Sequence, residues 1–352
     1  MKDTMKAGVL HAINDIRCEE IAVPEISDDE ILVKVSVAGI CGSDYERVLK
    51  TGTWRFPTVL GHEFGGLTVK TGKNVVGIQV GDKVVVNPMV PCGECYYCKL
   101  EKFNMCKDYG YIGSRSNGGF AEYAKVRYTN AYKVPNDMSD EAIASVDPIT
   151  VSLHAVLRGN LKIGETVAVF GAGAIGHYCM QWAKRMGASQ VIAIDLVDKK
   201  LEIAKAVGAD YGINPLQVKD VVGEIRRLTD NEGVNLAIES AGSEITVNHC
   251  ISVARKQGKV VYVGTPHKQI TLDSGVFENI LRKELTISGS WCYHFAPPIQ
   301  EWLVSIEHVY NRQFKIDPVI THRFPLEKVA DAFEMIRQRK ESFNKILITV
   351  GE

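Results

Sequence analysis

The residues Thr166-Val-Ala-Val-Phe-Gly-Ala-Gly-Ala-Ile-Gly176 carry the clearest fold signal of the chain. The first five are continuously apolar, as in a strand that is buried on both faces of a parallel sheet. Gly171, Gly173 and Gly176 follow with G-x-G-x-x-G spacing and precede a stretch with a helical pattern. Such glycines permit a tight turn, close approach of the backbone to a pyrophosphate, and close packing of helix on strand. The stretch therefore predicts a dinucleotide-binding loop.

The residues around this loop repeat the same pattern. Four further apolar runs have the pattern of buried strands: Gln190–Asp195, Leu236–Glu239, Lys259–Val263 and Leu285–Ser288. Helix-like stretches alternate with these runs. Strands that alternate with helices at this spacing indicate a doubly wound α/β domain of the Rossmann type. We assign residues 154–290 to this domain.

The acidic residue Asp195 ends the second strand of the series, about 20 residues after the glycine loop. A carboxylate in this position accepts hydrogen bonds from the ribose hydroxyls of adenosine. Leu196 follows it, and no arginine stands where a 2′-phosphate would need one, so NAD is favoured over NADP. Lys200 is a further candidate for contact with the ribose. A solvated strand-end carboxylate and a helix-surface lysine are the alternative interpretations.

The two ends of the chain differ in sequence pattern from the central α/β segment. Glu30–Val37 and Asp82–Val86 read as strands within a first half that is broken by glycine and proline. The segment after residue 290 contains one amphipathic helix, Leu326–Arg339, and a last strand, Lys345–Val350. We expect this tail to fold back onto the first domain, so that residues 1–153 and 291–352 form one β-rich unit.

Four cysteines lie in the sequence Cys92-Gly-Glu-Cys95-Tyr-Tyr-Cys98, followed by Cys106. Paired C-x-x-C steps bring thiolates close enough to share one tetrahedral ion, and four thiolates close a structural zinc site. A redox-active C-x-x-C motif would not need the fourth cysteine. The spacing therefore predicts a structural zinc lobe at residues 92–106.

A second set of metal-ligating residues is dispersed along the chain: Cys41, His62, Glu63 and Asp147. A catalytic zinc keeps one position open for substrate, so its ligands are fewer and farther apart in sequence. Taken alone, Cys41 would be a small buried hydrophobic residue and His62 a core histidine. Their combination with a dinucleotide domain favours a metal site.

Composition excludes several classes of function. The formal net charge of the 352 residues is −1, with charges of both signs interspersed, so nucleic acid is not an expected partner. No run approaches the ~20 apolar residues of a membrane-spanning helix, and the N-terminal segment has no apolar signal core. These features predict a cytoplasmic protein whose partner is a small molecule.

The chain resembles the zinc-dependent medium-chain alcohol dehydrogenases along essentially its whole length. The motifs that carry this resemblance are Cys41-Gly-Ser-Asp44, Gly61-His-Glu-Phe-Gly-Gly66, the cysteine lobe, Gly118-Gly-Phe-Ala-Glu-Tyr123, and the glycine loop with Asp195. The resemblance implies a GroES-like catalytic domain built from both chain ends, a Rossmann domain for NAD, one catalytic and one structural zinc, and a homodimer or homotetramer.

Asp147 distinguishes the branches of this family. Alcohol dehydrogenases proper place a second cysteine at this position, whereas polyol dehydrogenases of the sorbitol type place an acidic residue, usually glutamate, before proline. The chain has Asp147-Pro148, and aspartate is one methylene shorter than glutamate. Either Asp147 binds the ion through water, or Glu63 takes the ligand position. Within the polyol branch the chain is most similar to galactitol-1-phosphate 5-dehydrogenases, through Tyr111–Arg115 and Gly289–Trp291.

The resemblance also implies roles for individual residues. Ser43 would relay the substrate proton, and Asp44 would orient His62. The nicotinamide end of NAD would contact Thr150, Val263, Gly264 and Ser290. The adenosine end would contact the glycine loop, including Ile175. Polar candidates for substrate contact are Tyr45, Arg115, Glu122 and Tyr293, of which Arg115 suits a phosphate best.

The expected reaction is the reversible oxidation of a secondary alcohol of a polyol or polyol phosphate, from galactitol 1-phosphate to tagatose 6-phosphate. An unphosphorylated polyol of the sorbitol or xylitol type, or L-threonine, is the alternative substrate. A zinc-bound relative that senses NAD without catalysis is the alternative from another class; retention of Cys41, Ser43 and His62 argues against it.

Overall fold

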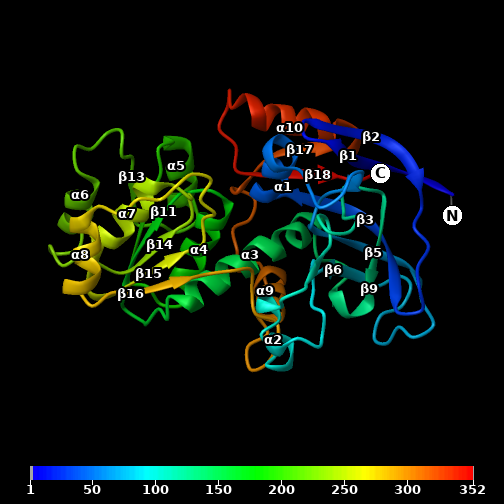
Figure 1. Cartoon of the computed structure of the whole chain (residues 1–352), viewed down its shortest axis with the longest axis horizontal. Helices are drawn as coiled ribbons and strands as arrows, with labels where there is room; N and C mark the ends of the chain where they lie inside the picture. The colour runs from blue at the N-terminus through cyan, green and yellow to red at the C-terminus, as the bar shows by residue number, and fades with distance from the viewer. Residues whose placement is uncertain (1–2, 352) are drawn as a thin grey trace. The chain divides into compact units, whose positions relative to one another are not determined.

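The computed structural model describes residues 3–351, which divide into two compact units (Figure 1). Of these described residues, 3–147 and 295–351 form one unit, and Pro148–His294 form the other. The first boundary lies inside a continuous helix, α3 (Asp140–Arg158), which also contains the predicted boundary after residue 153. A helix that passes from one unit into the next gives no loop-like signal in sequence, so the boundary cannot be read from composition.

The unit Pro148–His294 contains a six-stranded sheet in which every neighbouring pair is parallel. The strand order is β13-β12-β11-β14-β15-β16. The strands are β11 (Thr166–Phe170), β12 (Gln190–Ile194), β13 (Tyr211–Ile213), β14 (Val234–Glu239), β15 (Ala254–Tyr262) and β16 (Thr286–Gly289). Counted along the chain, this is the 3-2-1-4-5-6 order of the Rossmann fold. The predicted fold class is confirmed; β13, only three residues long, was not predicted.

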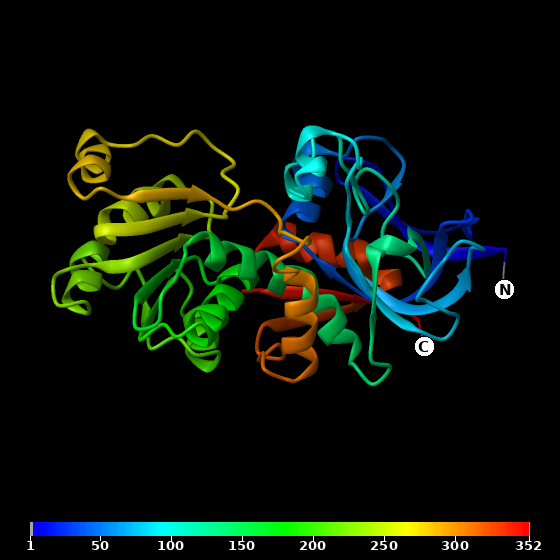
Figure 2. The ribbon, with the colours of Figure 1, turned by 90° about the horizontal axis from the view of Figure 1, so that it is seen from below.

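Helices cover the two faces of this parallel sheet (Figure 2). They are α4 (Ala174–Arg185), α5 (Asp198–Ala206), α6 (Val221–Arg227), α7 (Glu244–Val253) and α8 (Ser274–Arg282). Helix α4 contacts β11 and β12, whereas α7 contacts β14 and β15. The strands are therefore shielded on both sides, which explains why Val167, Ala168 and Val169 are all buried rather than alternating.

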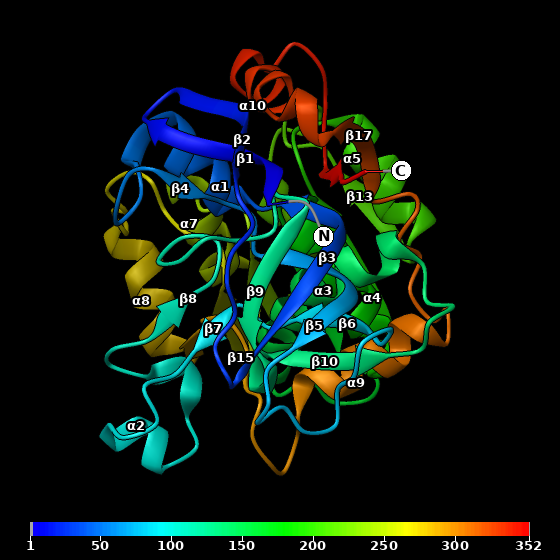
Figure 3. The ribbon, with the colours of Figure 1, turned by 90° about the vertical axis from the view of Figure 1, so that its right-hand side faces the viewer.

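The other unit is built on a larger, mostly antiparallel sheet with the order β10-β6-β5-β3-β18-β17, to which β9 adds by pairing with β3 (Figure 3). Its strands are β3 (Glu30–Ile40), β5 (Glu63–Thr71), β6 (Lys83–Val86), β9 (Tyr123–Arg127), β10 (Ala131–Val134), β17 (Ile320–Pro325) and β18 (Lys345–Thr349). Smaller sheets are formed by β1 (Thr4–Ala12), β2 (Asp15–Ala22) and β4 (Thr58–Val59), and by β7 (Met89–Val90) and β8 (Gly110–Tyr111). The predicted β-rich unit is thus present.

The C-terminal tail returns to this β-rich unit, as the sequence predicted. Strand β18 pairs antiparallel with β3, from Ile346 opposite Ile40 to Thr349 opposite Val37. The tail contains two helices, α9 (Glu301–Tyr310) and α10 (Val329–Gln338), and not one. Helix α9 was missed because the apolar run that begins at Trp302 resembles a short strand. Among residues 3–351, no helix is long and apolar enough to cross a membrane.

Candidate metal centres and cofactor site

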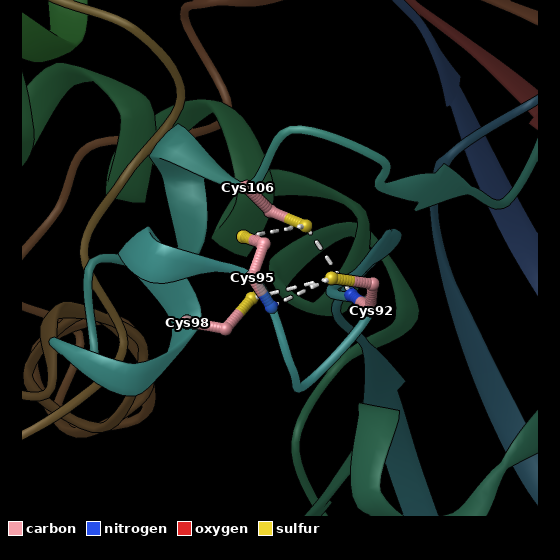
Figure 4. Close-up of side chains that lie close together, drawn as sticks. All are labelled: Cys92, Cys95, Cys98 and Cys106. Atoms are coloured by element: carbon pink, nitrogen blue, oxygen red, sulfur yellow. Dashed lines mark hydrogen bonds between the residues drawn. The ribbon is translucent and has the colours of Figure 1, made fainter.

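Four cysteine sulfurs converge in a loop that carries the short helix α2 (Tyr96–Lys99) (Figure 4). The sulfurs of Cys92, Cys95, Cys98 and Cys106 all lie within 4.8 Å of one another. Cys92 Sγ is 3.9 Å from Cys98 Sγ, and Cys95 Sγ is 4.0 Å from Cys106 Sγ. Thiolates bound tetrahedrally to zinc at 2.3 Å are separated by about 3.8 Å. The four residues therefore fit a zinc ion, and together they leave no position for a substrate.

Backbone N–H groups in this lobe donate hydrogen bonds to the cysteine sulfurs and so stabilise the thiolate form. The N–H of Cys92 donates to Cys106 Sγ at 3.2 Å, and the N–H of Cys95 donates to Cys92 Sγ at 3.4 Å. Backbone hydrogen bonds, first that of Lys107, lower the pKa of Cys95 to about 6, whereas burial raises the pKa of Cys98 to about 12 and also raises that of Cys106. Because a metal binds the thiolate rather than the thiol, the backbone contacts favour metal binding, first at Cys95.

The dispersed residues Cys41, His62 and Glu63 form a second convergent group, in which one donor atom of each lies within 4.8 Å of the others. Cys41 follows the end of β3, and His62 and Glu63 stand where β5 begins. These two strands pair antiparallel, with Gly39 opposite Glu63, so the pairing itself brings the three residues together. Sulfur, nitrogen and oxygen donors in one small space suit zinc, and three protein ligands leave a position open.

His62 is held in orientation by Asp44. The imidazole Nδ1 of His62 lies 3.4 Å from Asp44 Oδ1, and both side chains are buried. Asp44 Oδ2 accepts a hydrogen bond from the N–H of Cys41 at 3.0 Å, which fixes the carboxylate over the start of α1 (Gly42–Glu46). Burial acts to lower the pKa of His62, but the Asp44 carboxylate raises it well above the usual value. With Nδ1 turned to Asp44, Nε2 remains for a metal.

Ser43, the predicted proton relay, is contacted by an arginine that the sequence reasoning missed. Arg47 Nη1 donates a hydrogen bond to Ser43 Oγ at 2.8 Å and lies 3.7 Å from Asp44 Oδ1. A serine hydroxyl has one proton and two lone pairs. Because Arg47 takes one lone pair, Ser43 keeps one acceptor position and its own proton. The spacing of four residues between Ser43 and Arg47 on a helical turn was the available signal.

A second missed residue is Lys345, the first residue of β18. Its Nζ lies 2.6 Å from Glu63 Oε2, with the two side chains 4% and 2% exposed, and it also donates to the carbonyl of Ile40 at 3.2 Å. A lysine at the head of an apolar strand is ordinarily a surface residue, and no sequence pattern links it to Glu63, 282 positions away.

Three further candidates, for metal or substrate contact, are spread over the β-rich unit. Asp147 is 4% exposed and lies in α3; it is not part of the convergent group of Cys41, His62 and Glu63. Tyr45 lines a cavity of about 580 Å³ together with Lys50 and Arg339. Glu122 Oε2 accepts the backbone N–H of Lys6 at 2.7 Å, and is therefore engaged in joining two segments of the unit.

Arg115 has a distinctive environment. Its guanidinium carbon lies 4.2 Å from the ring centroid of Trp54 and 4.1 Å from that of Tyr109. Its Nη1 also donates a hydrogen bond to the carbonyl of Tyr109. The two aromatic residues had not been singled out in the sequence, where no regular spacing relates them to Arg115.

In the parallel-sheet unit, the glycine loop has the geometry that a pyrophosphate requires. Gly171 has a φ of +96°, which allows the tight turn after β11. A Cβ on Gly176 would lie 1.9 Å from the carbonyl oxygen of Gly171, whereas a Cβ on Gly173 would meet nothing within 4 Å. Gly176 thus permits close helix–strand packing, and Gly173 leaves open space at the N-terminus of α4. Free N–H groups at a helix N-terminus favour phosphate binding.

Asp195 lies beside this loop, at the carboxyl end of β12. Its Oδ2 accepts the N–H of Ala172 at 2.8 Å, and its Oδ1 accepts the N–H of Val197 at 3.0 Å. The carboxylate is thereby fixed between the glycine loop and the start of α5. Lys200 lies in α5, and its carbonyl oxygen is 3.0 Å from His177 Nε2.

The candidates for the nicotinamide end also lie in this unit. Val263 and Gly264 donate their N–H groups to the carbonyl of Glu239 at 2.9 and 3.0 Å, and Ser290 donates its N–H to the carbonyl of Tyr262 at 2.9 Å. Thr150, in α3, is fully buried, and so is Tyr293, the candidate for substrate contact that lies in this unit. Glu239, which had not been predicted, organises the loop after β14, because its Oε1 accepts the N–H groups of Ala241 and Gly242.

Comparisons with known proteins agree with both units. Residues 27–136 match the family model described as alcohol dehydrogenase GroES-like domain, and residues 174–309 match the one described as zinc-binding dehydrogenase. Galactitol 1-phosphate 5-dehydrogenase of Escherichia coli K12 is 36% identical over 348 residues, which cover 98% of this chain and 100% of the relative. Sorbitol dehydrogenase of Bacillus subtilis 168 is 33% identical over 350 residues, 98% of this chain and 97% of the relative.

Solved structures show the same similarity. The crystal structure of galactitol-1-phosphate dehydrogenase from Escherichia coli has a TM-score of 0.92 and covers 98% of this chain and 100% of its own, at 36% identity. A zinc-binding dehydrogenase of Sinorhizobium meliloti 1021 bound to NADP has a TM-score of 0.92 at 30% identity, with coverage of 99% and 100%. An alcohol dehydrogenase of Escherichia coli CFT073 complexed with NADH has a TM-score of 0.90 at 31% identity, with the same coverage.

These similarities confirm the predicted family and its cofactors, zinc and a nicotinamide dinucleotide. They also confirm that the chain is an enzyme, an oxidoreductase that acts on small-molecule alcohols. The chain belongs to the zinc-dependent medium-chain alcohol dehydrogenase family, in its polyol branch.

Proposed function

We propose that this enzyme uses NAD to oxidise a secondary hydroxyl of a polyol phosphate to the ketone, converting galactitol 1-phosphate to tagatose 6-phosphate. The observation that carries the proposal is the convergence of Cys41, His62 and Glu63 in a chain that is 36% identical, over its full length, to a galactitol 1-phosphate 5-dehydrogenase. The substrate loses a hydride from carbon and a proton from oxygen, and the products are the ketose phosphate, NADH and a proton.

Cys41, His62 and Glu63 are the proposed ligands of the catalytic zinc. Zinc in this place would act as a Lewis acid and lower the pKa of the substrate hydroxyl. Asp44 would hold His62 with Nε2 toward the metal, since its carboxylate lies 3.4 Å from Nδ1. Asp147 remains a fourth candidate, either as a direct ligand or through a water molecule. The lobe of Cys92, Cys95, Cys98 and Cys106 would hold the structural zinc.

Ser43 is the proposed acceptor of the substrate proton. Its hydroxyl already accepts a hydrogen bond from Arg47 at 2.8 Å, which leaves one lone pair for the substrate hydroxyl and one proton to pass on. The guanidinium of Arg47 stays protonated throughout, so it can stabilise negative charge on Ser43 Oγ without taking part in the transfer.

The glycine loop and Asp195 are the proposed site for the adenosine and pyrophosphate of the cofactor. NAD would accept the hydride at its nicotinamide ring. Asp195 favours NAD over NADP because a fixed carboxylate accepts hydrogen bonds from ribose hydroxyls and repels a 2′-phosphate. Ile175, Lys200, Thr150, Val263, Gly264 and Ser290 complete the proposed cofactor contacts.

The substrate contacts are proposed on chemical grounds. Tyr45, Glu122 and Tyr293 offer hydrogen bonds to hydroxyl groups, and Arg115 offers the bidentate geometry that a phosphate takes. An unphosphorylated polyol of the sorbitol type is the second candidate, supported by the 33% identity to a sorbitol dehydrogenase. L-Threonine remains a further alternative.

The proposed assembly is a homodimer or homotetramer joined along β16, the edge strand of the parallel sheet. Ile287 on β16 is 39% exposed, and Phe277 and Leu281 on the adjacent helix α8 are 53% and 64% exposed. An unpaired edge strand flanked by exposed apolar side chains is suited to pairing with a second copy. The molar mass in solution tests this assembly.

NADH formation at pH 7–9 with galactitol 1-phosphate, sorbitol and L-threonine, measured side by side, tests the proposed substrate. We expect kcat/KM for galactitol 1-phosphate to exceed that for sorbitol by about 100-fold or more, the effect of two charge-assisted hydrogen bonds to phosphate. A preference for sorbitol or threonine would refute the substrate assignment. A protein that binds zinc and NAD but reduces no NAD with any of the three would mean that its substrate is another alcohol.

A further inference from the structure

Arg115 contacts two aromatic rings that belong to different segments of the chain. Its guanidinium carbon lies 4.2 Å from the ring centroid of Trp54 and 4.1 Å from that of Tyr109. The segments are tied together near this point, because Thr53 Oγ1 donates a hydrogen bond of 2.7 Å to the carbonyl of Ser114. The backbone N–H of Arg115 donates to the carbonyl of Tyr111 at 2.8 Å. Arg115 is therefore restrained through its backbone and through two aromatic rings that pack against its guanidinium.

A guanidinium carries its N–H donors at its edge. Arg115 has five N–H donors in its side chain, and within residues 3–351 one of its side-chain nitrogens, Nη1, is hydrogen-bonded, to the carbonyl of Tyr109. No carboxylate among these residues forms an ion pair with it. Other arginines of this unit, such as Arg17, Arg323 and Arg337, are paired with Asp15, Glu141 and Glu334. Arg115 thus presents a positive charge that no acidic group of the described chain neutralises.

Trp54 is unusual in its own right. Its side chain is 73% exposed, although large aromatic side chains ordinarily bury most of their surface. Its contact with Arg115 gives it a defined position. A planar cation that packs against two aromatic rings is restrained in orientation by cation–π attraction, and this reduces the entropy lost when an anion binds to its edge.

A series of ring contacts connects this cluster to the proposed metal site. The ring of Tyr109 lies 6.3 Å from that of Tyr111, and the ring of Tyr111 lies 5.4 Å from that of His62. All these residues belong to the β-rich unit. The packed rings of Tyr109 and Tyr111 therefore link Arg115 to His62.

We propose that Trp54 and Tyr109 hold Arg115 as the receptor for the phosphate group of the substrate, and that Trp54 is a specificity-determining residue for phosphorylated polyols. The inference rests on the proposed function, because it names the residues that would bind the phosphate group of the proposed substrate. Arginine is suited to this role because its fork matches two phosphate oxygens at once. Trp54 acts through Arg115 by fixing the plane of the guanidinium.

Steady-state kinetics of the zinc-loaded enzyme with galactitol 1-phosphate and with galactitol test this assignment. In Arg115→Ala, we expect KM for galactitol 1-phosphate to rise about 100-fold, with kcat and the constants for galactitol changed less than threefold. Trp54→Ala should give a smaller rise of about fivefold to tenfold in the same KM, and Trp54→Phe, which keeps an aromatic face, should restore most of it. Arg55→Ala is the matched control, because it removes an exposed arginine charge from the loop that carries Trp54. It should leave the KM for galactitol 1-phosphate within twofold of the wild type.

Inorganic phosphate serves as a second probe that does not depend on turnover of a phosphorylated substrate. In the wild type it should inhibit galactitol oxidation, or quench tryptophan fluorescence if galactitol is not turned over. Both effects should be lost in Arg115→Ala and retained in Arg55→Ala. If the enzyme prefers galactitol 1-phosphate but Arg115→Ala and Arg55→Ala behave alike, the phosphate site lies elsewhere and only this inference fails. If the wild type does not distinguish the two polyols and phosphate has no effect, the proposed substrate fails as well.

Discussion

Lys345 Nζ and Glu63 Oε2 form a buried ion pair of 2.6 Å that joins the last strand of the chain to the proposed zinc site. Strand β3 lies between the strands that carry the two residues. The contact needs a glycine on that strand, because a Cβ on Gly39 would lie 2.2 Å from Glu63 Oε2. With one carboxylate oxygen engaged by Lys345, the other remains for a metal. The C-terminal tail thus contributes to the site through a residue that does not itself bind zinc.

Lys345→Met should destabilise the metal-free protein strongly, because it leaves the carboxylate of Glu63 buried without a cation. The expected loss in the free energy of unfolding is roughly 3–5 kcal/mol, measured by urea unfolding. The double variant Glu63→Gln/Lys345→Met removes both charges and should recover most of this loss. Lys83→Met, which breaks the more exposed pair with Asp140, should cost only about 1 kcal/mol. Equal costs for Lys345→Met and Lys83→Met would argue against a buried pair.

Ser43→Ala should lower kcat by about 100-fold or more, the usual effect of removing a proton-transfer group. The affinity for NAD, measured by NADH fluorescence titration, should remain within twofold of the wild type because the cofactor contacts lie on other residues. Wild-type turnover in this variant would mean that the substrate proton leaves by another route.

Asp195→Ala should shift cofactor preference from NAD toward NADP. The carboxylate is fixed by the N–H groups of Ala172 and Val197, so its loss removes a preorganised acceptor for the ribose hydroxyls. We expect the ratio of kcat/KM for NAD to that for NADP to fall at least tenfold. Asp198→Ala is a suitable control, because Asp198 bonds to Asn214 and Gln217 instead. An unchanged ratio in Asp195→Ala would remove Asp195 from the cofactor site.

The stability of the protein should fall in mild acid because of His177. Burial lowers the pKa of His177 from 6.5 to about 4. Between these two values the unfolded chain binds a proton that the native protein does not, so stability decreases as the pH falls below 6.5 and the loss is complete near pH 4. The expected slope is up to ~1.4 kcal/mol per pH unit.

Urea unfolding of wild type and His177→Gln at pH 7, 5.5 and 4.5 measures this slope. The difference in unfolding free energy between the two proteins should shift in favour of the variant as the pH falls. A difference that does not vary with pH would show that His177 is not the responsible group.

The sequence predicted the parts of the fold that depend on local pattern. The unbroken apolar run Thr166–Phe170 and the glycines after it identified the first strand and the loop. Burial on both faces requires consecutive apolar residues, and the tight turn requires glycine, so both constraints are visible in a short stretch of sequence. The four cysteines were identified for the same reason, since 15 consecutive residues, 92–106, contain the whole site.

The contacts that could not be predicted are those made between distant segments. Lys345 meets Glu63 only because β18 and β5 both pair with β3. Trp54 and Tyr109 meet at Arg115 because two loops are tied together by Thr53 and Ser114. Such contacts depend on strand order and loop path, and neither lysine nor tryptophan carries a spacing pattern that would reveal them.

Metal content together with activity in Cys41→Ser tests the central claim most directly. The wild type should contain two zinc ions per chain, and Cys41→Ser should retain one and lose NADH formation, whereas its thermal midpoint stays close to that of the wild type because the cysteine lobe is intact. Conversely, Cys95→Ser should lose the structural zinc. A Cys41→Ser variant that keeps two zinc ions and wild-type turnover would contradict the assignment of the working metal to Cys41, His62 and Glu63.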